Sequence, residues 1–242
     1  MPPATSSPLT PVSDRIVVEE SGVMTAPVPA SREDAATSVM AALAEACPEG
    51  EVRLIGSMAT SAGPDAFSDI DVRWAIPPGQ ASEQLQALRL TLERVAEVES
   101  LRVDPEVRPD SCLVFVRFEG WPLWWRVDLE IHATGLRTTD VRGADPWSPA
   151  ESACMGVIVT VKALARNRPE AAEDLMARAL RRVDGTDVAG SWPVRIASLL
   201  DHLESSSPST AALVSRTRHL VREVLGGESG RGADDSDRGL PD

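Results

Sequence analysis

The chain has 242 residues, of which 43% are hydrophobic and 25% are charged, and its formal net charge is −13 at pH 7. This length is enough for one large domain or two small ones, and the composition is ordinary for a globular protein. An acidic surface repels nucleic acid, so the charge argues against nucleic acid as a partner and favours a small molecule. No run of about 18 apolar residues is present, so we expect neither a transmembrane helix nor a membrane partner.

The ends of the chain and its cysteines indicate the compartment. Residues 1–30 are rich in Pro, Ser and Thr, which predicts a disordered leader, and they lack the basic start and apolar core of a secretory signal. The Gly- and Asp-rich segment 226–242 predicts a disordered tail. Cys47, Cys112 and Cys154 are widely spaced and form no metal-ligand pattern, so we expect buried, reduced thiols in a cytoplasmic protein.

The first part of the predicted fold contains both helices and strands. A helix is expected to begin after Ser31, because Ser31 and Asp34 form a variant of the capping box. The apolar positions between 80 and 99 recur with helical spacing, which is typical of a helix that packs against a core. The expected elements are helices over about 31–47 and 80–99, strands over about 51–56 and 69–76, a short strand near 101–103, and two antiparallel strands over about 111–118 and 123–132.

The second part of the chain is helical by pattern. A polar loop over 133–149 separates it from the strands, and its first helix is apolar on much of its circumference, which predicts burial against the sheet. We therefore expect an α+β fold, in which a domain over 31–147 precedes a helical domain over 148–225. The four predicted helices cover about 149–167, 169–183, 193–205 and 208–225.

The most informative stretch joins the first two predicted strands. The first strand runs into Gly56 and Ser57, and the second carries Asp69 and Asp71. Side chains two positions apart on a strand point the same way, so the two aspartates project together. Paired carboxylates repel each other unless a hard cation such as Mg²⁺ lies between them, and magnesium commonly also holds substrate phosphates. Gly56 would let the backbone approach a phosphate, and Ser57 adds a hydroxyl where a helical turn begins.

Two later segments hold further candidates. The strand over about 123–132 places Arg126, Asp128 and Glu130 on one face, which by itself indicates only a charged, half-exposed strand. Lys162 is the only lysine of an arginine-rich chain. Its retention suggests a position where a compact ammonium group is needed rather than a planar guanidinium.

These residues resemble the signature of the polymerase-β-like nucleotidyltransferase superfamily. Ile55-Gly56-Ser57 is followed, after eleven residues, by Asp69-Ile70-Asp71-Val72, and Val127-Asp128-Leu129 is similar to the segment that supplies a third carboxylate from a later strand. Ser68, just before the aspartate pair, looks like the form found in small antibiotic nucleotidyltransferases of the aminoglycoside or lincosamide type. The resemblance implies a mixed or antiparallel sheet flanked by helices, followed by a C-terminal helical bundle.

The resemblance also implies an activity. The activity is the transfer of a nucleoside monophosphate to a hydroxyl of a small molecule, with Mg²⁺ as cofactor and pyrophosphate as product. The expected donor is ATP, from which AMP is transferred. The residues implied for catalysis and metal binding are Asp69, Asp71 and Asp128, with Glu130 as the alternative third carboxylate. The residues implied for nucleotide binding are Gly56, Ser57 and Lys162.

Several interpretations stay open at this point. A cationic acceptor such as an aminoglycoside would suit an acidic protein and would imply antibiotic resistance, although acidity also serves solubility alone. A protein-modifying adenylyltransferase and a non-catalytic nucleotide-binding protein that retains the fold are the alternatives to a small-molecule enzyme. An interaction domain with an accidental motif is a third. Small nucleotidyltransferases can also dimerise to complete a site, so a homodimer is among the expected arrangements.

Overall fold

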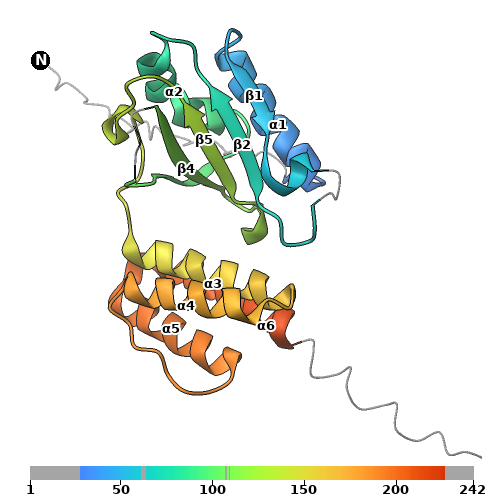
Figure 1. Cartoon of the computed structure of the whole chain (residues 1–242), viewed down its shortest axis with the longest axis vertical. Helices are drawn as coiled ribbons and strands as arrows, with labels where there is room; N and C mark the ends of the chain where they lie inside the picture. The colour runs from blue at the N-terminus through green and yellow to red at the C-terminus, as the bar shows by residue number, and fades with distance from the viewer. Residues whose placement is uncertain (1–27, 61–63, 107, 109, 227–242) are drawn as a thin grey trace, which may run out of the picture.

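The computed structural model describes residues 28–60, 64–106, 108 and 110–226, so most of the predicted leader and tail lies outside the described residues (Figure 1). The helices are α1 (Arg32–Ala46), α2 (Ala81–Glu93), α3 (Pro149–Ala165), α4 (Pro169–Arg181), α5 (Trp192–Ser206) and α6 (Ala211–Gly226). The strands are β1 (Glu51–Leu54), β2 (Ile70–Ala75), β3 (Val98–Val103), β4 (Ser111–Phe118) and β5 (Val127–His132). Short 3-10 turns are η1 (Gly56–Ala59), η2 (Leu123–Trp125), η3 (Thr138–Asp140) and η4 (Pro208–Thr210).

The five strands form one mixed sheet in the order β1-β2-β5-β4-β3. The central pair, β2 and β5, is parallel, and the other neighbours are antiparallel. Helices α1 and α2 pack on one face of this sheet, and the C-terminal helices form a separate group of elements (Figure 1). The α+β fold predicted from the sequence is therefore confirmed.

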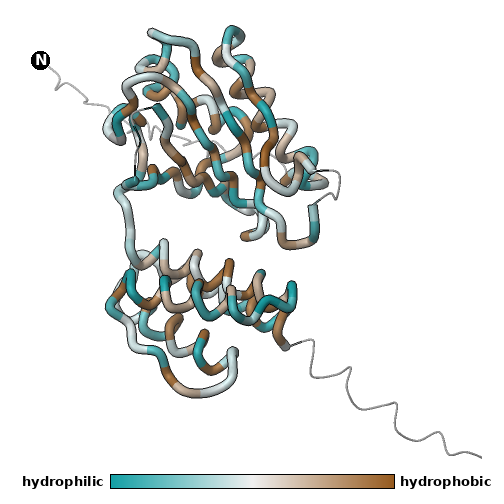
Figure 2. Tube along the Cα trace, in the orientation of Figure 1, coloured by the Kyte–Doolittle hydropathy of each residue, from teal (hydrophilic) through white to brown (hydrophobic). Residues whose placement is uncertain are grey.

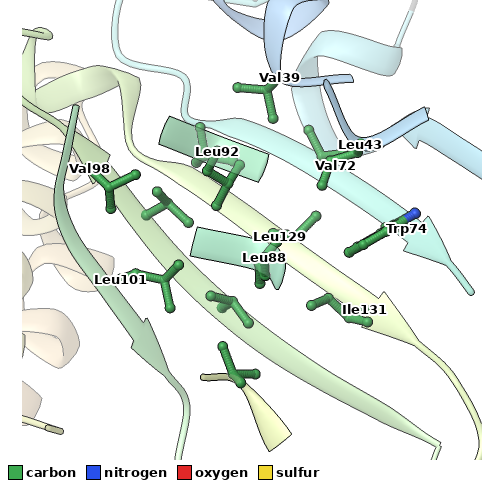
Figure 3. Close-up of a cluster of buried hydrophobic side chains, with 14 of the residues drawn as sticks. Val39, Leu43, Val72, Trp74, Leu88, Leu92, Val98, Leu101, Leu129 and Ile131 are labelled. Atoms are coloured by element: carbon green, nitrogen blue, oxygen red, sulfur yellow. The ribbon is translucent and has the colours of Figure 1, made fainter. Parts of the chain in front are cut away.

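Alternating side chains divide the sheet into an apolar and a polar face. Both β2 and β5 have the same pattern, in which every second residue is buried. The change of hydropathy along the strands is visible in Figure 2, and Figure 3 shows the apolar side chains gathered under α1 and α2. The labelled core residues come from α1, α2 and three of the strands, β2, β3 and β5: Val39, Leu43, Val72, Trp74, Leu88, Leu92, Val98, Leu101, Leu129 and Ile131. The polar side chains of β2 and β5 are thereby directed to the opposite face.

A second apolar cluster holds the C-terminal helices together. Helix α3 contacts α4, α5 and α6, and most of its side chains are buried. The apolar circumference predicted burial against the sheet, but the apolar side chains of α3 pack mainly against these helices instead. Gly156 is required in this packing because a Cβ atom there would lie 2.7 Å from the Cβ atom of Ala179 in α4. In the described part of the chain no helix is long and apolar enough to cross a membrane. The three cysteines are free and buried, as expected.

The structure corrects some predicted boundaries. The strand expected over 123–132 begins only at Val127, because Leu123–Trp125 form a 3-10 turn in which the Trp125 N–H donates to the Pro122 carbonyl. The helix expected up to residue 99 ends at Glu93, and the following strand begins at Val98, where pairing with β4 replaces helical hydrogen bonds. Strand pairing between distant segments decided both boundaries, and it leaves no local signal.

Glu151 connects the helical group to the polar face of the sheet. This buried carboxylate, in the first turn of α3, forms ion pairs with Arg102 of β3 and Arg117 of β4, the latter with an Nη1–Oε1 distance of 2.5 Å. It also accepts a hydrogen bond from the Ser100 hydroxyl at 2.9 Å. Burial alone would raise the pKa of Glu151, but these two arginines lower it. Its role is therefore structural.

Glu151→Gln is expected to lower the free energy of unfolding by about 3 kcal/mol, because Arg102 and Arg117 lose the buried charge of the carboxylate that they share. Urea titration followed by circular dichroism measures this loss. Glu173→Gln is the matched control, since Glu173 pairs with Arg195 at the exposed surface and should change the midpoint little. Equal losses in the two variants would show that Glu151 does not join the two parts of the fold.

Candidate functional site

Strand register brings two of the predicted carboxylates side by side. Asp71 of β2 lies directly opposite Asp128 of β5 in the parallel central pair. Their neighbours Ile70, Val72 and Val127 point into the core, so both carboxylates are directed to the polar face. Asp69 precedes β2 and lies near enough for its charge to act on Asp71. The three aspartates thus form one cluster, called here the carboxylate cluster.

The carboxylate cluster carries more negative charge than its surroundings neutralise. Burial raises the pKa of Asp71 to about 6, and the charges of Asp128 and Asp69 add to this effect. Asp69 and Asp128 each have a cationic partner, described below. Among the described residues, however, no hydrogen-bond donor or cation contacts the Asp71 carboxylate directly. A carboxylate held half-buried beside two others is a typical feature of a cation or phosphate-transfer site.

Gly56 fits against Asp71. The Ile55 N–H donates to the Asp71 carbonyl at 3.0 Å, which fixes the end of β1 beside β2. Gly56 has φ +62°, and a Cβ atom there would overlap Oδ2 of Asp71 and lie 2.8 Å from its Cγ atom. Both the positive φ and the close approach require glycine. Ser57 follows in the 3-10 turn Gly56–Ala59, and its hydroxyl has no partner in the part of the chain that the structure describes.

Helix α3 brings Lys162 to the carboxylate cluster. Its Nζ atom forms an ion pair with Oδ1 of Asp69, and only 4% of the side chain is exposed. The ammonium group also lies 5.6 Å from the centroid of the Trp124 ring, within range of a cation–π interaction. Burial lowers the pKa of Lys162, and the Asp69 charge opposes that shift. The structure thus places the ammonium group of Lys162 in the carboxylate cluster.

Arg126 is a residue of the site to which the sequence assigned no role. Its guanidinium binds Asp128 with two hydrogen bonds, Nε–Oδ1 at 2.5 Å and Nη2–Oδ2 at 2.6 Å. It also lies over the Phe115 ring, with its Cζ atom 4.8 Å from the ring centroid. Despite this partner, burial keeps the pKa of Asp128 above its ordinary value. The available signal was its position two residues before Asp128 on the same face.

Glu130, the alternative third carboxylate, is engaged elsewhere. It lies opposite Arg73 in the register of β2 and β5 and accepts two hydrogen bonds from that guanidinium, at 3.0 and 2.7 Å. His132 Nε2 lies 2.8 Å from its other oxygen. Burial alone would raise the pKa of Glu130, but Arg73 and His132 lower it. The geometry therefore favours Asp128 over Glu130 as the neighbour of Asp71.

The carboxylate cluster suits magnesium by the chemistry of its donors. Three carboxylates on adjoining segments supply the hard oxygen ligands that Mg²⁺ prefers. Within the described residues, no three His, Cys, Asp or Glu side chains converge as a ready-made metal site. Lys162 and Arg126 hold oxygens of Asp69 and Asp128 that a metal would need. A metal would bind after these side chains exchange partners.

Comparison with known proteins adds only distant likenesses. No protein-family model matches the chain, and no curated protein matches its sequence. An aminoglycoside 6-adenyltransferase from Bacillus subtilis is similar over 81% of this chain and 98% of its own, with 11% identity and a TM-score of 0.29. A structure of the GLD-2/RNP-8 complex is similar over 86% of this chain and 58% of its own, with 16% identity and a TM-score of 0.32. Such scores carry no argument about function, which must come from the geometry above.

The raised pKa of Asp71 has a consequence for stability in the absence of metal. The folded protein holds this proton more tightly than the unfolded chain, whose aspartates titrate near 3.8. The stability that protonated Asp71 contributes to the fold is therefore complete below pH 3.8 and is lost as the pH rises through about 6. In EDTA at pH 7.5, a value roughly 1.5 units above that pKa, Asp71→Asn should raise the melting temperature by about 2–4 °C.

Thermal unfolding of the two proteins between pH 4 and 8 measures this effect, and the gain should disappear toward the acid end. Asp65→Asn is the control of opposite sign. Its hydrogen bonds to Arg166 hold the pKa of Asp65 below its usual range, so the substitution should lower the melting temperature near neutral pH. If the melting temperature of Asp71→Asn never exceeded the native value, the ionised form of Asp71 would not destabilise the folded protein.

Proposed function

We propose that this protein is a magnesium-dependent nucleotidyltransferase, which moves a nucleoside monophosphate, AMP from ATP, to a hydroxyl of a small molecule and releases pyrophosphate. One observation carries the proposal: an incompletely neutralised cluster of Asp69, Asp71 and Asp128, with a glycine turn fitted against its central member. This chemistry needs positioning and charge stabilisation more than covalent help from the protein. A carboxylate cluster with a glycine turn beside it suits both needs.

Each residue has a role in this proposal. Asp69, Asp71 and Asp128 would hold Mg²⁺, which when bound supplies charge stabilisation for the attacking and leaving oxygens. The backbone of Gly56 and the hydroxyl of Ser57 would bind the terminal phosphates, and Lys162 would pair with them as a point charge. The acceptor hydroxyl forms the new bond to the α-phosphorus, the bond to the bridging oxygen breaks, and the hydroxyl proton passes to the Asp128 carboxylate.

Calorimetric titration with a non-hydrolysable ATP analogue, with and without magnesium, tests the proposal. The native protein should bind the analogue only with magnesium, and the Asp69→Asn/Asp71→Asn variant should not bind it. Gly56→Ala should weaken binding by about 10–100-fold, because the new methyl group displaces the Asp71 carboxylate. Gly79→Ala is a matched control, since Gly79 also has a positive φ but has no atom within 4 Å of an added Cβ. Absence of nucleotide binding in the native protein would refute the proposal.

A non-catalytic nucleotide-binding protein is the second candidate. The observation that favours it is the pair of internal cations, since Lys162 and Arg126 already neutralise two of the three carboxylates without a metal. Such a protein would bind the analogue equally well with and without magnesium. The same titration therefore separates the two candidates.

A further inference from the structure

A cavity of about 510 Å³ lies between the sheet and the helical group. Strands β3 and β4 supply one wall, and helices α3 and α4 supply the other. Its volume is in the range of pockets that hold small molecules. The side chains that matter below are Arg102, Phe115, Arg126, Trp147, Arg178 and Arg182.

The cavity adjoins the carboxylate cluster through Arg126. This residue lines the cavity and binds both oxygens of Asp128. In the strand order β1-β2-β5-β4-β3, Gly56 follows β1 on one side of the carboxylate cluster, whereas the cavity lies over β4 and β3 on the other side. If the triphosphate of the donor occupies the Gly56 side, the cavity is left for the acceptor.

The cavity is rich in arginine. Five arginines line it, and three of them are paired with carboxylates: Arg102, Arg117 and Arg126. Arg178 of α4 and Arg182, the C-cap residue of this helix, form no ion pair with any described residue. Their side-chain hydrogen bonds go only to backbone carbonyls, at 3.3 and 3.4 Å. Two guanidinium groups thus remain available to an anion.

The cavity also has an apolar part. The rings of Phe115 and Trp147 lie with centroids 6.3 Å apart, and Trp147 is among the few large apolar residues that are substantially exposed, at 37%. Met155, Val159 and Leu175 of the helical wall complete this side. Aromatic and aliphatic side chains at this spacing suit a flat apolar group.

We propose that this cavity is the acceptor site and that the acceptor is an anion, with a carboxylate or phosphate group bound by Arg178 and Arg182 and a flat apolar part against Phe115 and Trp147. The assignment to the acceptor rests on the proposed nucleotidyl transfer. A cationic aminoglycoside, which the net charge of the chain alone would suit, meets two arginines here that form no ion pair with any described residue. The class of acceptor is therefore opposite in charge to the one expected from composition.

Saturation-transfer NMR with four matched probes tests this inference on the full chain. The probes are benzoate, phenyl phosphate, benzyl alcohol and benzylamine, which share a ring and differ in charge. Benzoate and phenyl phosphate should bind, the better of the two identifying the anionic group, and benzylamine should not. Arg178→Gln/Arg182→Gln should weaken binding of the anions at least about tenfold. Arg181→Gln, an exposed arginine of the same helix outside the cavity, should leave it unchanged.

Each contrary result has a definite meaning. Binding of benzylamine in preference to benzoate, or an equal effect of Arg181→Gln, would overturn the anionic site. Displacement of phenyl phosphate by the magnesium–ATP analogue in simple competition would assign the cavity to the donor and overturn the acceptor assignment. Failure of the analogue to bind at all, with benzoate still bound, would refute the proposed transfer, whereas binding of the analogue without any anion would refute only this inference.

Discussion

Asp71→Asn is expected to reduce the rate of pyrophosphate release from magnesium–ATP by at least about 10³-fold. Asp71 is the central member of the carboxylate cluster, and the only one whose carboxylate contacts no cation among the described residues. Asparagine keeps its size but removes the charge on which metal binding depends. Pyrophosphate release measured with anionic hydroxylated acceptors, and with water alone, checks the prediction.

Glu130→Gln is the matched control for this experiment. Glu130 lies on the same face of β5 as Asp128, one pleat along, but its carboxylate is bound by Arg73 and His132. The control should change the rate less than about threefold, a difference smaller than 1 kcal/mol. A loss of activity in Glu130→Gln together with retained activity in Asp128→Asn would make Glu130 the third carboxylate. Full activity of Asp71→Asn would remove the basis of the proposed function.

The sequence was sufficient to predict the elements that depend on local pattern. Alternation along 127–132 correctly separated the core residues Val127 and Leu129 from the polar Asp128 and Glu130, because a strand has a period of two. Ser31 caps α1 as predicted, its hydroxyl accepting from the Asp34 N–H at 3.0 Å. The placement of Asp128 beside Asp71, in contrast, depends on pairing between segments more than fifty residues apart. The resemblance implied that pairing, but no local pattern did.

The parts of the site that were not predicted come from long-range contacts of charged side chains. Arginine occurs throughout this chain, so a position two residues before Asp128 was not enough to distinguish Arg126, which binds Asp128, from the arginines of exposed surfaces. The cavity likewise combines Arg102 of β3 with Arg178 of α4 and its C-cap residue Arg182, which are far apart in the sequence and lie together only in the folded chain. Net charge describes the whole surface and cannot report such a local group of arginines.

Lys162→Met is expected to weaken binding of the ATP analogue by roughly 10²-fold, because the triphosphate loses a charged hydrogen-bond partner. Binding of the AMP portion alone should change little, since a nucleoside monophosphate lacks the terminal phosphates to which Lys162 is assigned. Calorimetry with the ATP analogue and with AMP, both in magnesium, gives the two affinities. Lys162→Arg should not restore binding, because the site is only 4% exposed and a planar guanidinium is larger than an ammonium group.

The ratio of the two affinities separates a role in nucleotide binding from a role in structure. If Lys162 served only to neutralise Asp69, its loss would disturb the carboxylate cluster and weaken AMP and the triphosphate analogue alike. Removal of both partners in Lys162→Met/Asp69→Asn would then restore stability in EDTA, as expected for a pair whose charges mainly offset each other. A selective loss of triphosphate binding instead means that the ammonium group leaves Asp69 when substrate arrives. When Lys162 pairs with the phosphates instead, the Asp69 carboxylate becomes free to bind the metal. Nucleotide and magnesium would therefore bind cooperatively.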